Sequence, residues 1–383
     1  MNRNTRMIWL GCLSYLLVGL STVVFGSLLS EVLHVYGRSF GDGGQLIFAQ
    51  FAGFLAGVLL VPFGLRHLGY RKILTAAFLL LLIAHTILYS QPHWSILFVS
   101  LIINGFGFGT AQTAVGTLLL ESMGHRKAIV MSRLEVSFGI GALVMPILSG
   151  LFISRQSAFA SFAVIAVLAL MMALIWGMQS FKSAVYQDTA ATDAHTEAGT
   201  AKMMELLVLL SFIFIYVGLE TSVINFLPSL FAERLGLSNA SAALSVSFFW
   251  TSMIAGRLLS GYIAEKTGYM RFLLAGTFGA LVALCGMAAI SKIIAVFAFV
   301  LMLGLFLAGI FAIAIVYASR LFPHNTRRTT SILIASGGIG GAVLPLLVGR
   351  SMDYFQPALT IWLLAGCALC MLALLLALKP NKK

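Results

Sequence analysis

Residues 132–150 read SRLEVSFGIGALVMPILSG, and residues 331–349 read SILIASGGIGGAVLPLLVG. The two stretches lie 199 positions apart and carry the same residue at ten of their nineteen positions. Identity of this extent at one fixed offset indicates an internal repeat. The chain is therefore predicted to consist of two related halves.

The same offset relates two further parts of the chain. It aligns, without gaps, Gly19/Gly218, Leu20/Leu219, Thr22/Thr221, Val24/Val223, Gly57/Gly256, Leu59/Leu258, Leu60/Leu259, Gly69/Gly268 and Tyr70/Tyr269. Because one offset holds in three separate regions, the halves must share their length, their order of elements and their direction. This pattern predicts a parallel duplication.

The composition places this chain in a membrane. Hydrophobic residues make up 60% of the 383 and charged residues 9%, whereas about 25% charged residues is usual for a soluble domain. Continuous apolar runs recur at the length of roughly 20 residues that crosses a bilayer as a helix, without the alternation of barrel strands. We therefore predict an all-α membrane protein of twelve transmembrane helices, arranged as two six-helix bundles related by a parallel pseudo-twofold repeat.

The chain also predicts where these bundles begin and end. The predicted helices cover residues 7–30, 44–65, 72–91, 95–120, 129–153, 158–180, 204–232, 241–264, 270–290, 293–319, 329–350 and 358–378. The longest polar stretch, 182–202, separates the sixth helix from the seventh. We expect an N-terminal bundle over residues 1–180, a cytoplasmic linker over 181–203 and a C-terminal bundle over 204–383.

The net charge of +12 has a simple explanation in such a protein. The basic residues are spread over short loops and gather on no soluble face, which excludes a nucleic-acid partner. With the N-terminus inside, only five of them fall in outer segments, namely Arg38, Arg155, Arg234, Lys292 and Arg350. Because cytoplasmic loops are enriched in Lys and Arg, we expect a multi-pass inner-membrane (plasma-membrane) protein with both termini in the cytoplasm.

A family resemblance follows from the repeat and from one loop. A parallel six-plus-six repeat is typical of transporters that rock two bundles around a midplane site. The loop after the eighth predicted helix resembles the G-x-x-x-D-R/K-x-G-x-x-R motif of the major facilitator superfamily, with Gly261, Glu265, Lys266, Gly268 and Arg271 in place. The corresponding loop of the first half departs from the motif, with Pro62 for the glycine and Arg66 for the acid. The chain resembles this superfamily over essentially its whole length.

Shorter stretches resemble one branch of the superfamily. The segments Tyr216–Glu220 (YVGLE), Phe249–Trp250 and Gly256–Arg257 are similar to segments of the fucose/galactose/glucose:proton symporters. The fourth predicted helix has Leu101 where many drug/proton antiporters carry a basic residue before their Asn/Gln–Gly step. The resemblance therefore implies sugar–proton symport, with drug export as the alternative.

A polar residue that occurs in only one half is not required by the fold that both halves share, so its presence calls for a separate function. Glu220 corresponds to Ser21, and Glu135 corresponds to Ile334. Glu220 lies near the middle of its helix, where a carboxylate is costly in a bilayer and usually has a function. We predict that Glu220 and Glu135 carry proton coupling. The alternative for Glu220 is a static partner for a basic or amide side chain.

The fourth predicted helix carries a candidate face for substrate. Asn104, Phe108 and Gln112 follow at intervals of four and share one side of the helix. Amides bond hydroxyl groups and an aromatic ring stacks on an apolar face, which suits a hydroxylated ring. Tyr216 and Asn225 on the seventh helix are added to this predicted substrate site. The alternative for the amides is hydrogen bonding between helices.

Arg133 and Glu135 are two residues apart, so they point in different directions from their helix. We expect Arg133 and Arg257 to belong to the gate between the halves, with Glu265 near Arg133 and the start of the fifth helix when the cytoplasmic side is closed. The alternative is a local structural pair of Arg133 or Glu135 with Glu121 or Arg126.

These observations predict a secondary active transporter and not an enzyme. The chain has no ATP-binding loop or soluble domain, so we expect a gradient to drive a small polar organic solute, such as a sugar, by alternating access and proton symport. The alternatives are a proton-driven exporter of drugs or metabolites and, on the same scaffold, a lipid flippase or a non-transporting receptor. The expected partners are the solute, protons and membrane lipid. We expect a monomer with no cofactor and no metal.

Overall fold

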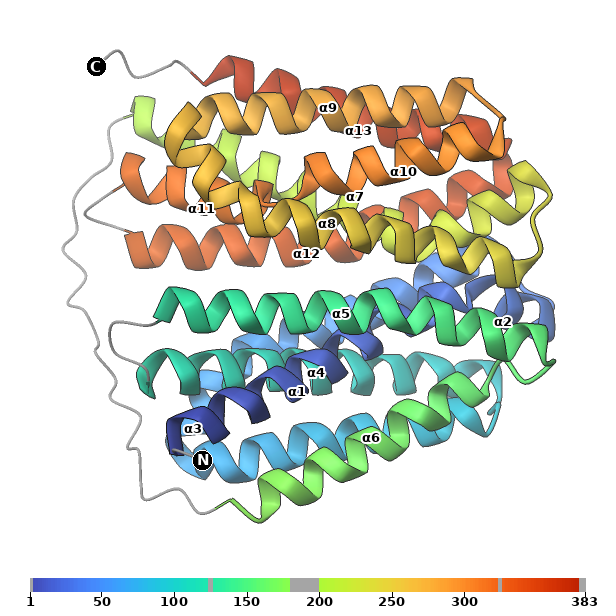
Figure 1. Ribbon diagram of the computed structural model, residues 1–383, viewed down its shortest axis with the longest axis vertical. Coiled ribbons are helices and arrows are strands. Elements are labelled where there is room, and N and C mark those ends of the chain that lie inside the picture. The colour runs from blue at the N-terminus through green and yellow to red at the C-terminus, as the bar shows by residue number, and fades with distance from the viewer. Residues whose placement is uncertain (1–2, 123–126, 180–199, 323–325, 379–383) are drawn as a thin grey trace.

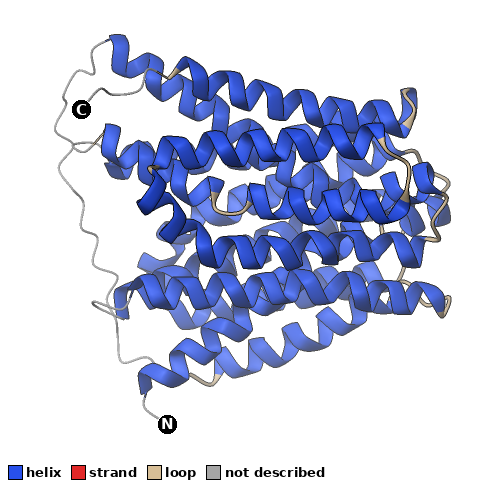
Figure 2. Cartoon of the chain, turned by 45° about the horizontal axis from the view of Figure 1, so that its top comes forward, coloured by secondary structure: helices blue, strands red, loops and turns tan. Residues whose placement is uncertain are grey.

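The computed structural model describes residues 3–122, 127–179, 200–322 and 326–378, and within these ranges every regular element is a helix (Figures 1 and 2). The first bundle contains α1 (Arg3–Ser27), α2 (Leu29–Tyr36), α3 (Phe40–Tyr89), α4 (Trp94–Ser122), α5 (Lys127–Ser154) and α6 (Ala160–Gly177). The second contains α7 (Thr200–Leu235), α8 (Asn239–Thr267), α9 (Tyr269–Ala289), α10 (Ile293–Leu307), α11 (Ile310–Leu321), α12 (Thr326–Tyr354) and α13 (Pro357–Ala377).

These described helices make twelve crossings of a membrane, as the sequence predicted. Helix α3 has 50 residues, about 75 Å at the rise of an α-helix, which is more than twice the hydrocarbon core of a bilayer. It reverses at Gly69, whose φ of 71° and ψ of 166° are not helical. Gly268 makes the corresponding turn between α8 and α9 with φ of 94°, so both halves turn on a glycine.

Two crossings are broken, whereas the sequence predicted continuous helices. The first crossing is divided between α1 and α2 at Leu28, with φ of −105° and ψ of 2°. The tenth is divided between α10 and α11, where Gly309 adopts a left-handed φ of 78°. The carbonyl of Leu307 at this break accepts a hydrogen bond from the Tyr216 hydroxyl at 3.0 Å. Tertiary contacts therefore stabilise a helix break that no proline in the sequence predicts.

The two bundles lie side by side, and α1 begins at the same end of the molecule at which α13 ends (left in Figure 1). We name this end the terminal side and the other end the opposite side. Helix α1 packs on α5 as α7 packs on α12, and α3 packs on α6 as α9 packs on α13. The same packing thus occurs twice, which agrees with the repeat.

Glycines of the quoted repeat permit these close crossings. A Cβ atom on Gly141 would lie 2.1 Å from the Leu16 carbonyl oxygen, and one on Gly340 would lie 1.9 Å from that of Phe214. Both distances exclude any side chain, so the helix backbones meet directly at these residues, as small residues allow in membranes. The stretch that carries the repeat therefore also joins the helices within each bundle.

Contacts across the bundle interface establish the pseudo-twofold axis. Ser30 donates to Ser229 at 2.9 Å, and Gly26 lies against Asn225. Each pair is related by the repeat offset of 199. Corresponding residues can touch one another only beside the axis that relates them. The axis therefore runs between α1 and α7, and the prediction of a parallel repeat is confirmed.

The surface of both bundles is apolar, as a lipid environment requires. Among the exposed side chains are Trp9, Phe63, Val167, Leu174, Leu258, Phe278, Ile294 and Leu369. Exposed apolar surface on this scale indicates contact with lipid, since soluble monomers expose only small apolar patches. The described helices include eleven that are long and apolar enough to cross a membrane, and one of these is the double-length α3.

Candidate functional site

A cavity of about 480 Å³ lies between the two bundles. Ser132 and Ile334 line the end of the cavity nearer the terminal side, and Thr22 and Thr221 line its other end, near the axis. Its aromatic lining consists of Phe51, Phe54, Phe108, Phe138, Tyr216, Trp250 and Phe311. Its polar lining consists of Thr22, Gln112, Ser132, Glu135, Glu220, Thr221, Arg257 and Ser260. Both bundles therefore supply polar and aromatic groups to one site.

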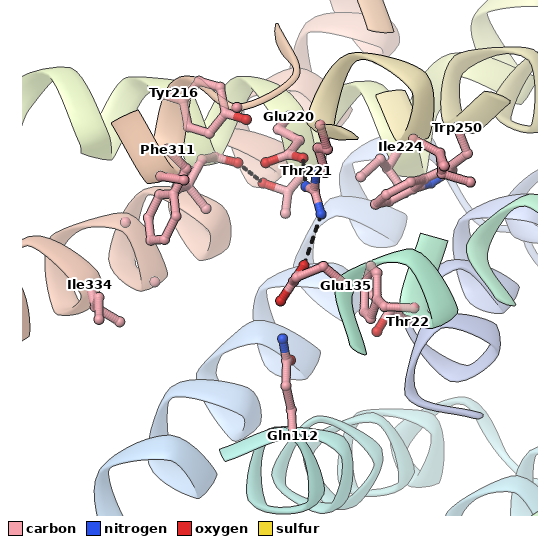
Figure 3. Close-up of a pocket in the computed structure, with 18 of the residues that line it drawn as sticks. Thr22, Gln112, Glu135, Tyr216, Glu220, Thr221, Ile224, Trp250, Phe311 and Ile334 are labelled. Atoms are coloured by element: carbon pink, nitrogen blue, oxygen red, sulfur yellow. Dashed lines mark hydrogen bonds and ion pairs between the residues drawn. The ribbon is translucent and has the colours of Figure 1, made fainter. Parts of the chain in front are cut away.

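The charged centre of this cavity is a cluster of three side chains, in which Arg257 of α8 lies between two carboxylates. Figure 3 labels these carboxylates, Glu135 and Glu220. The Nη1 atom of Arg257 lies 3.1 Å from Oε2 of Glu135 on α5, and its Nη2 lies 3.1 Å from Oε1 of Glu220 on α7. The guanidinium also lies over the Trp250 ring, 5.3 Å from its centroid. Because Glu135 belongs to the first bundle and Glu220 to the second, the Glu135–Arg257 ion pair joins the bundles.

The two carboxylates differ in their access to the cavity. The Glu135 side chain is 40% exposed and the Glu220 side chain 13% exposed. The cluster holds two carboxylates and one guanidinium, so it carries one excess negative charge when both are ionised. Such charge inside a membrane is costly unless it is paired or neutralised. The arrangement is therefore suited to bind one proton or another small cation.

The structure brings three of the five predicted substrate residues to the cavity, namely Phe108, Gln112 and Tyr216. The Gln112 side chain extends from α4 toward Glu135 (Figure 3). The Tyr216 hydroxyl is already used in its bond to the Leu307 carbonyl. Its ring is 1% exposed and lies beside that of Phe311, with centroids 6.4 Å apart, so Tyr216 forms part of the wall behind the cavity surface.

Asn104 and Asn225 are fully buried and do not line the cavity. Asn104 accepts a hydrogen bond from Ser21 at 2.7 Å inside the first bundle, and Asn225 donates to the Thr221 carbonyl at 2.9 Å beside the axis. The geometry thus supports the alternative that the Asn104 amide joins helices. Asn104 lies about 12 Å from Gln112 along α4, so the shared helix face extends past the end of the cavity.

Of the predicted gate residues, Arg257 lies in the charged cluster of the cavity, whereas Arg133 and Glu265 lie toward the terminal side. Arg133 and Glu265 are exposed, and Glu265 forms no ion pair with the residues that the structure describes. A contact that forms only when the terminal side is closed would be absent here, so the latch stays a prediction. The side chains of Glu121 and Arg126, the alternative partners of Arg133 and Glu135, lie outside the described ones.

The remaining motif residues lie in the same region. Gly268 forms the turn that leads into α9, and the Lys266 ammonium lies 6.0 Å from the ring centroid of Tyr262. Arg271 is exposed, and beyond its own helix turn no atom of the described residues lies within 4 Å of a Cβ built on Gly261. The motif thus supplies a turn and exposed charges on the terminal side.

The bundles are joined at the opposite side by contacts that the sequence did not predict. The Asp353 carboxylate of α12 accepts hydrogen bonds from the backbone N–H groups of Phe40 and Gly41, both at 2.8 Å. Glu31 accepts one from the Asn239 amide at 2.7 Å. The repeat offered a signal for Asp353, because the first half has Ser154 at the corresponding position.

Fold and site together define a membrane transporter built from two homologous bundles around a central cavity. The Major Facilitator Superfamily model matches residues 11–302 and 208–383. The chain belongs to this superfamily, and it is a multi-pass membrane transporter and not an enzyme.

Individual relatives narrow the comparison. The chain is 30% identical over 375 residues to the glucose/mannose transporter GlcP of Bacillus subtilis (strain 168), covering 95% of this chain and 92% of that one. The structure of a point mutant of the nucleoside transporter NupG matches with a TM-score of 0.83 at 11% identity, covering 99% and 100% of the two chains. A D-xylose-proton symporter structure matches with a TM-score of 0.81 at 18% identity, covering 97% and 96%. These two structures share the fold of this chain.

Proposed function

We propose that this protein is a proton-coupled sugar symporter that works by alternating access. The observation that carries the proposal is the cluster in which Arg257 bridges Glu135 of one bundle and Glu220 of the other. Similarity to a glucose/mannose transporter over 95% of the chain supports a hexose as the substrate.

The lining of the cavity supports a sugar. Its volume of about 480 Å³ lies within the range of about 300–1,000 Å³ typical of small-molecule sites. The half-buried rings of Phe54, Phe138 and Phe311 offer apolar surface to a sugar ring. The Gln112 amide offers both hydrogen-bond donors and an acceptor to its hydroxyl groups.

The charge of the cluster supports proton coupling. A proton on Glu135 would neutralise the excess charge and weaken the ion pair that joins the bundles, while Glu220 would keep its bond to Arg257. Glu135 is the more exposed carboxylate, so water in the cavity reaches it more readily than it reaches Glu220. A contact whose strength depends on protonation shifts the balance between conformations.

The proposal includes an orientation and a working unit. Because the loops on the terminal side hold most of the basic residues, we assign that side to the cytoplasm and the structure to a state closed toward the outside. The cavity is formed within one chain, which favours a monomer in the cell membrane. The proposed bundles span residues 1–180 and 204–383, although α7 begins at Thr200, within the proposed linker.

The test is uptake into proteoliposomes of the purified protein, with radiolabelled D-glucose, D-mannose and D-xylose offered under an imposed proton gradient, a sodium gradient or no gradient. We expect accumulation of a hexose under the proton gradient alone. Accumulation under the sodium gradient alone would refute proton coupling. Binding and transport of none of these sugars would refute the sugar assignment and favour an exporter or a flippase.

A further inference from the structure

We propose that Thr22 and Thr221 form a matched pair of hydrogen-bond acceptors that contacts the hydroxyl groups of the substrate from both bundles. The pair would remain in contact with substrate whichever side of the protein is open. This inference rests on the proposed sugar function and adds two specificity-determining residues to it.

The position of the pair follows from the repeat. Thr22 and Thr221 are related by the offset of 199, and both line the cavity (Figure 3). One turn further toward the opposite side, Gly26 lies against Asn225. One turn beyond that, Ser30 bonds Ser229. The two threonines therefore lie beside the axis, where the closed part of the interface ends and the cavity begins.

Hydrogen bonding determines what the two hydroxyls can recognise. Thr22 Oγ1 donates to the Val18 carbonyl at 2.8 Å, and Thr221 Oγ1 donates to the Val217 carbonyl at 2.5 Å. Each hydroxyl has a single proton, and that proton is used within its own helix. The remaining lone pairs can only accept hydrogen bonds. The ligand must therefore present donors toward both bundles, as a sugar ring with hydroxyl groups on its two sides does.

The location near the axis also explains why the pair would serve both conformations. When two bundles rock around a midplane site, a residue moves in proportion to its distance from the pivot. Thr221 adjoins Glu220 at the centre of the site, whereas Ser30 and Ser229 lie two turns away in the closed interface. Opening of the opposite side must separate those serines, and it would expose the threonines to the new cavity.

The experiment measures sugar affinity and transport in both directions for Thr22→Val and Thr221→Val. Valine keeps the branched shape and removes the acceptor. Loss of one hydrogen bond predicts that each substitution weakens D-glucose binding about fivefold. It should also raise KM by a similar factor for zero-trans entry and zero-trans exit in proteoliposomes of known orientation.

Matched controls come from the same chain. Thr86 and Thr251 make the same bond to the carbonyl four residues earlier, but they are exposed and do not line the cavity. Thr86→Val and Thr251→Val should leave affinity unchanged. Thr22→Ser and Thr221→Ser keep the acceptor, so they should retain most of the affinity even where a valine variant proves unstable.

Binding of a series of deoxyglucoses adds a measurement that distinguishes a substrate contact from a purely structural role of the threonines. The wild type should lose affinity for the analogue that lacks the hydroxyl bonded by Thr22, and Thr22→Val should no longer discriminate against it. Unchanged glucose affinity in both valine variants, or a change in only one transport direction, would overturn the inference. Failure of the wild-type protein to bind any sugar would instead overturn the proposed function.

Discussion

Among single residues, Arg257 connects most of the proposed mechanism, because its two carboxylate partners belong to different bundles. Glutamine at position 135 cannot carry a proton, and glutamine at position 220 removes the excess negative charge that the proton neutralises, although it can still bond the guanidinium. We therefore expect Glu220→Gln and Glu135→Gln each to abolish accumulation driven by a proton gradient. Counterflow exchange of labelled sugar, which needs no net proton release, should continue. Parallel accumulation and exchange assays in proteoliposomes check both expectations.

Glu233→Gln is the matched control for this experiment. Glu233 lies on α7 with Glu220, but it is exposed and does not line the cavity. It should accumulate sugar like the wild type. If Glu220→Gln and Glu135→Gln also did so, the cluster would have a structural role and the coupling ion would bind elsewhere.

A second prediction at this scale separates the two amides of α4. Gln112 faces the cavity, whereas Asn104 is buried beyond the end of the cavity and accepts a hydrogen bond from Ser21. Gln112→Ala should weaken sugar binding by about 1–3 kcal/mol, the usual effect of losing a polar partner. Asn104→Ala should lower the thermal unfolding temperature with little change in affinity. If Asn104→Ala weakened sugar binding and Gln112→Ala only lowered the unfolding temperature, Asn104 would be the residue that contacts the substrate.

At the scale of elements, the break between α10 and α11 depends on two residues. Gly309 has a left-handed φ, and a Cβ built there would lie 2.3 Å from that of Ser260. Tyr216 satisfies the carbonyl of Leu307. Gly309→Ala should therefore destabilise the protein through both backbone strain and overlap. Tyr216→Phe should cost about 1–3 kcal/mol through the unpaired carbonyl.

Thermal unfolding in detergent measures both effects. Gly366→Ala on α13 is the control, since no described residue beyond its own helix turn lies within 4 Å of its Cβ position and alanine favours a helix over glycine. It should leave stability unchanged or raise it slightly. A Gly309→Ala protein as stable as the wild type would mean that the break is not required for folding.

For the molecule as a whole, conformational balance depends on contacts made on one side only. Asp353 bonds the first backbone N–H groups of α3 across the interface. An anion at a helix N-terminus contributes about 0.3–1 kcal/mol, and up to about 2 when partly buried. Asp353→Asn should therefore favour opening of the opposite side. Spin labels at Arg155 and Lys292, one in each bundle, should report a larger population at long distance.

The second prediction for the whole molecule concerns the terminal side and has the opposite sign. Glu265 is expected to meet Arg133 and the start of α5 only when that side closes. Glu265→Gln should therefore favour an open terminal side, by at most about tenfold for a loss near 1.4 kcal/mol. Labels at His67 and Thr267 measure it by double electron–electron resonance. An unchanged distance distribution would exclude the latch.

The amino-acid sequence alone determined the architecture. Twelve apolar runs had to cross a membrane, and the offset of 199 residues predicted that the crossings repeat in parallel. The stretches that carry this repeat include Gly141 and Gly340, which the structure places at close helix crossings. These features depend on the length of the apolar runs and on the spacing of the repeat, and both can be read directly from the sequence.

Only the tertiary structure decided which polar groups meet. Asn104 and Gln112 share one face of α4, yet only Gln112 reaches the cavity. The packing of the neighbouring helices decides how far the cavity extends along α4. Arg257 finds Glu135 at a separation of 122 residues, and Asp353 finds Gly41 at 312. No local pattern encodes such contacts, since they depend on how the two finished bundles dock against each other.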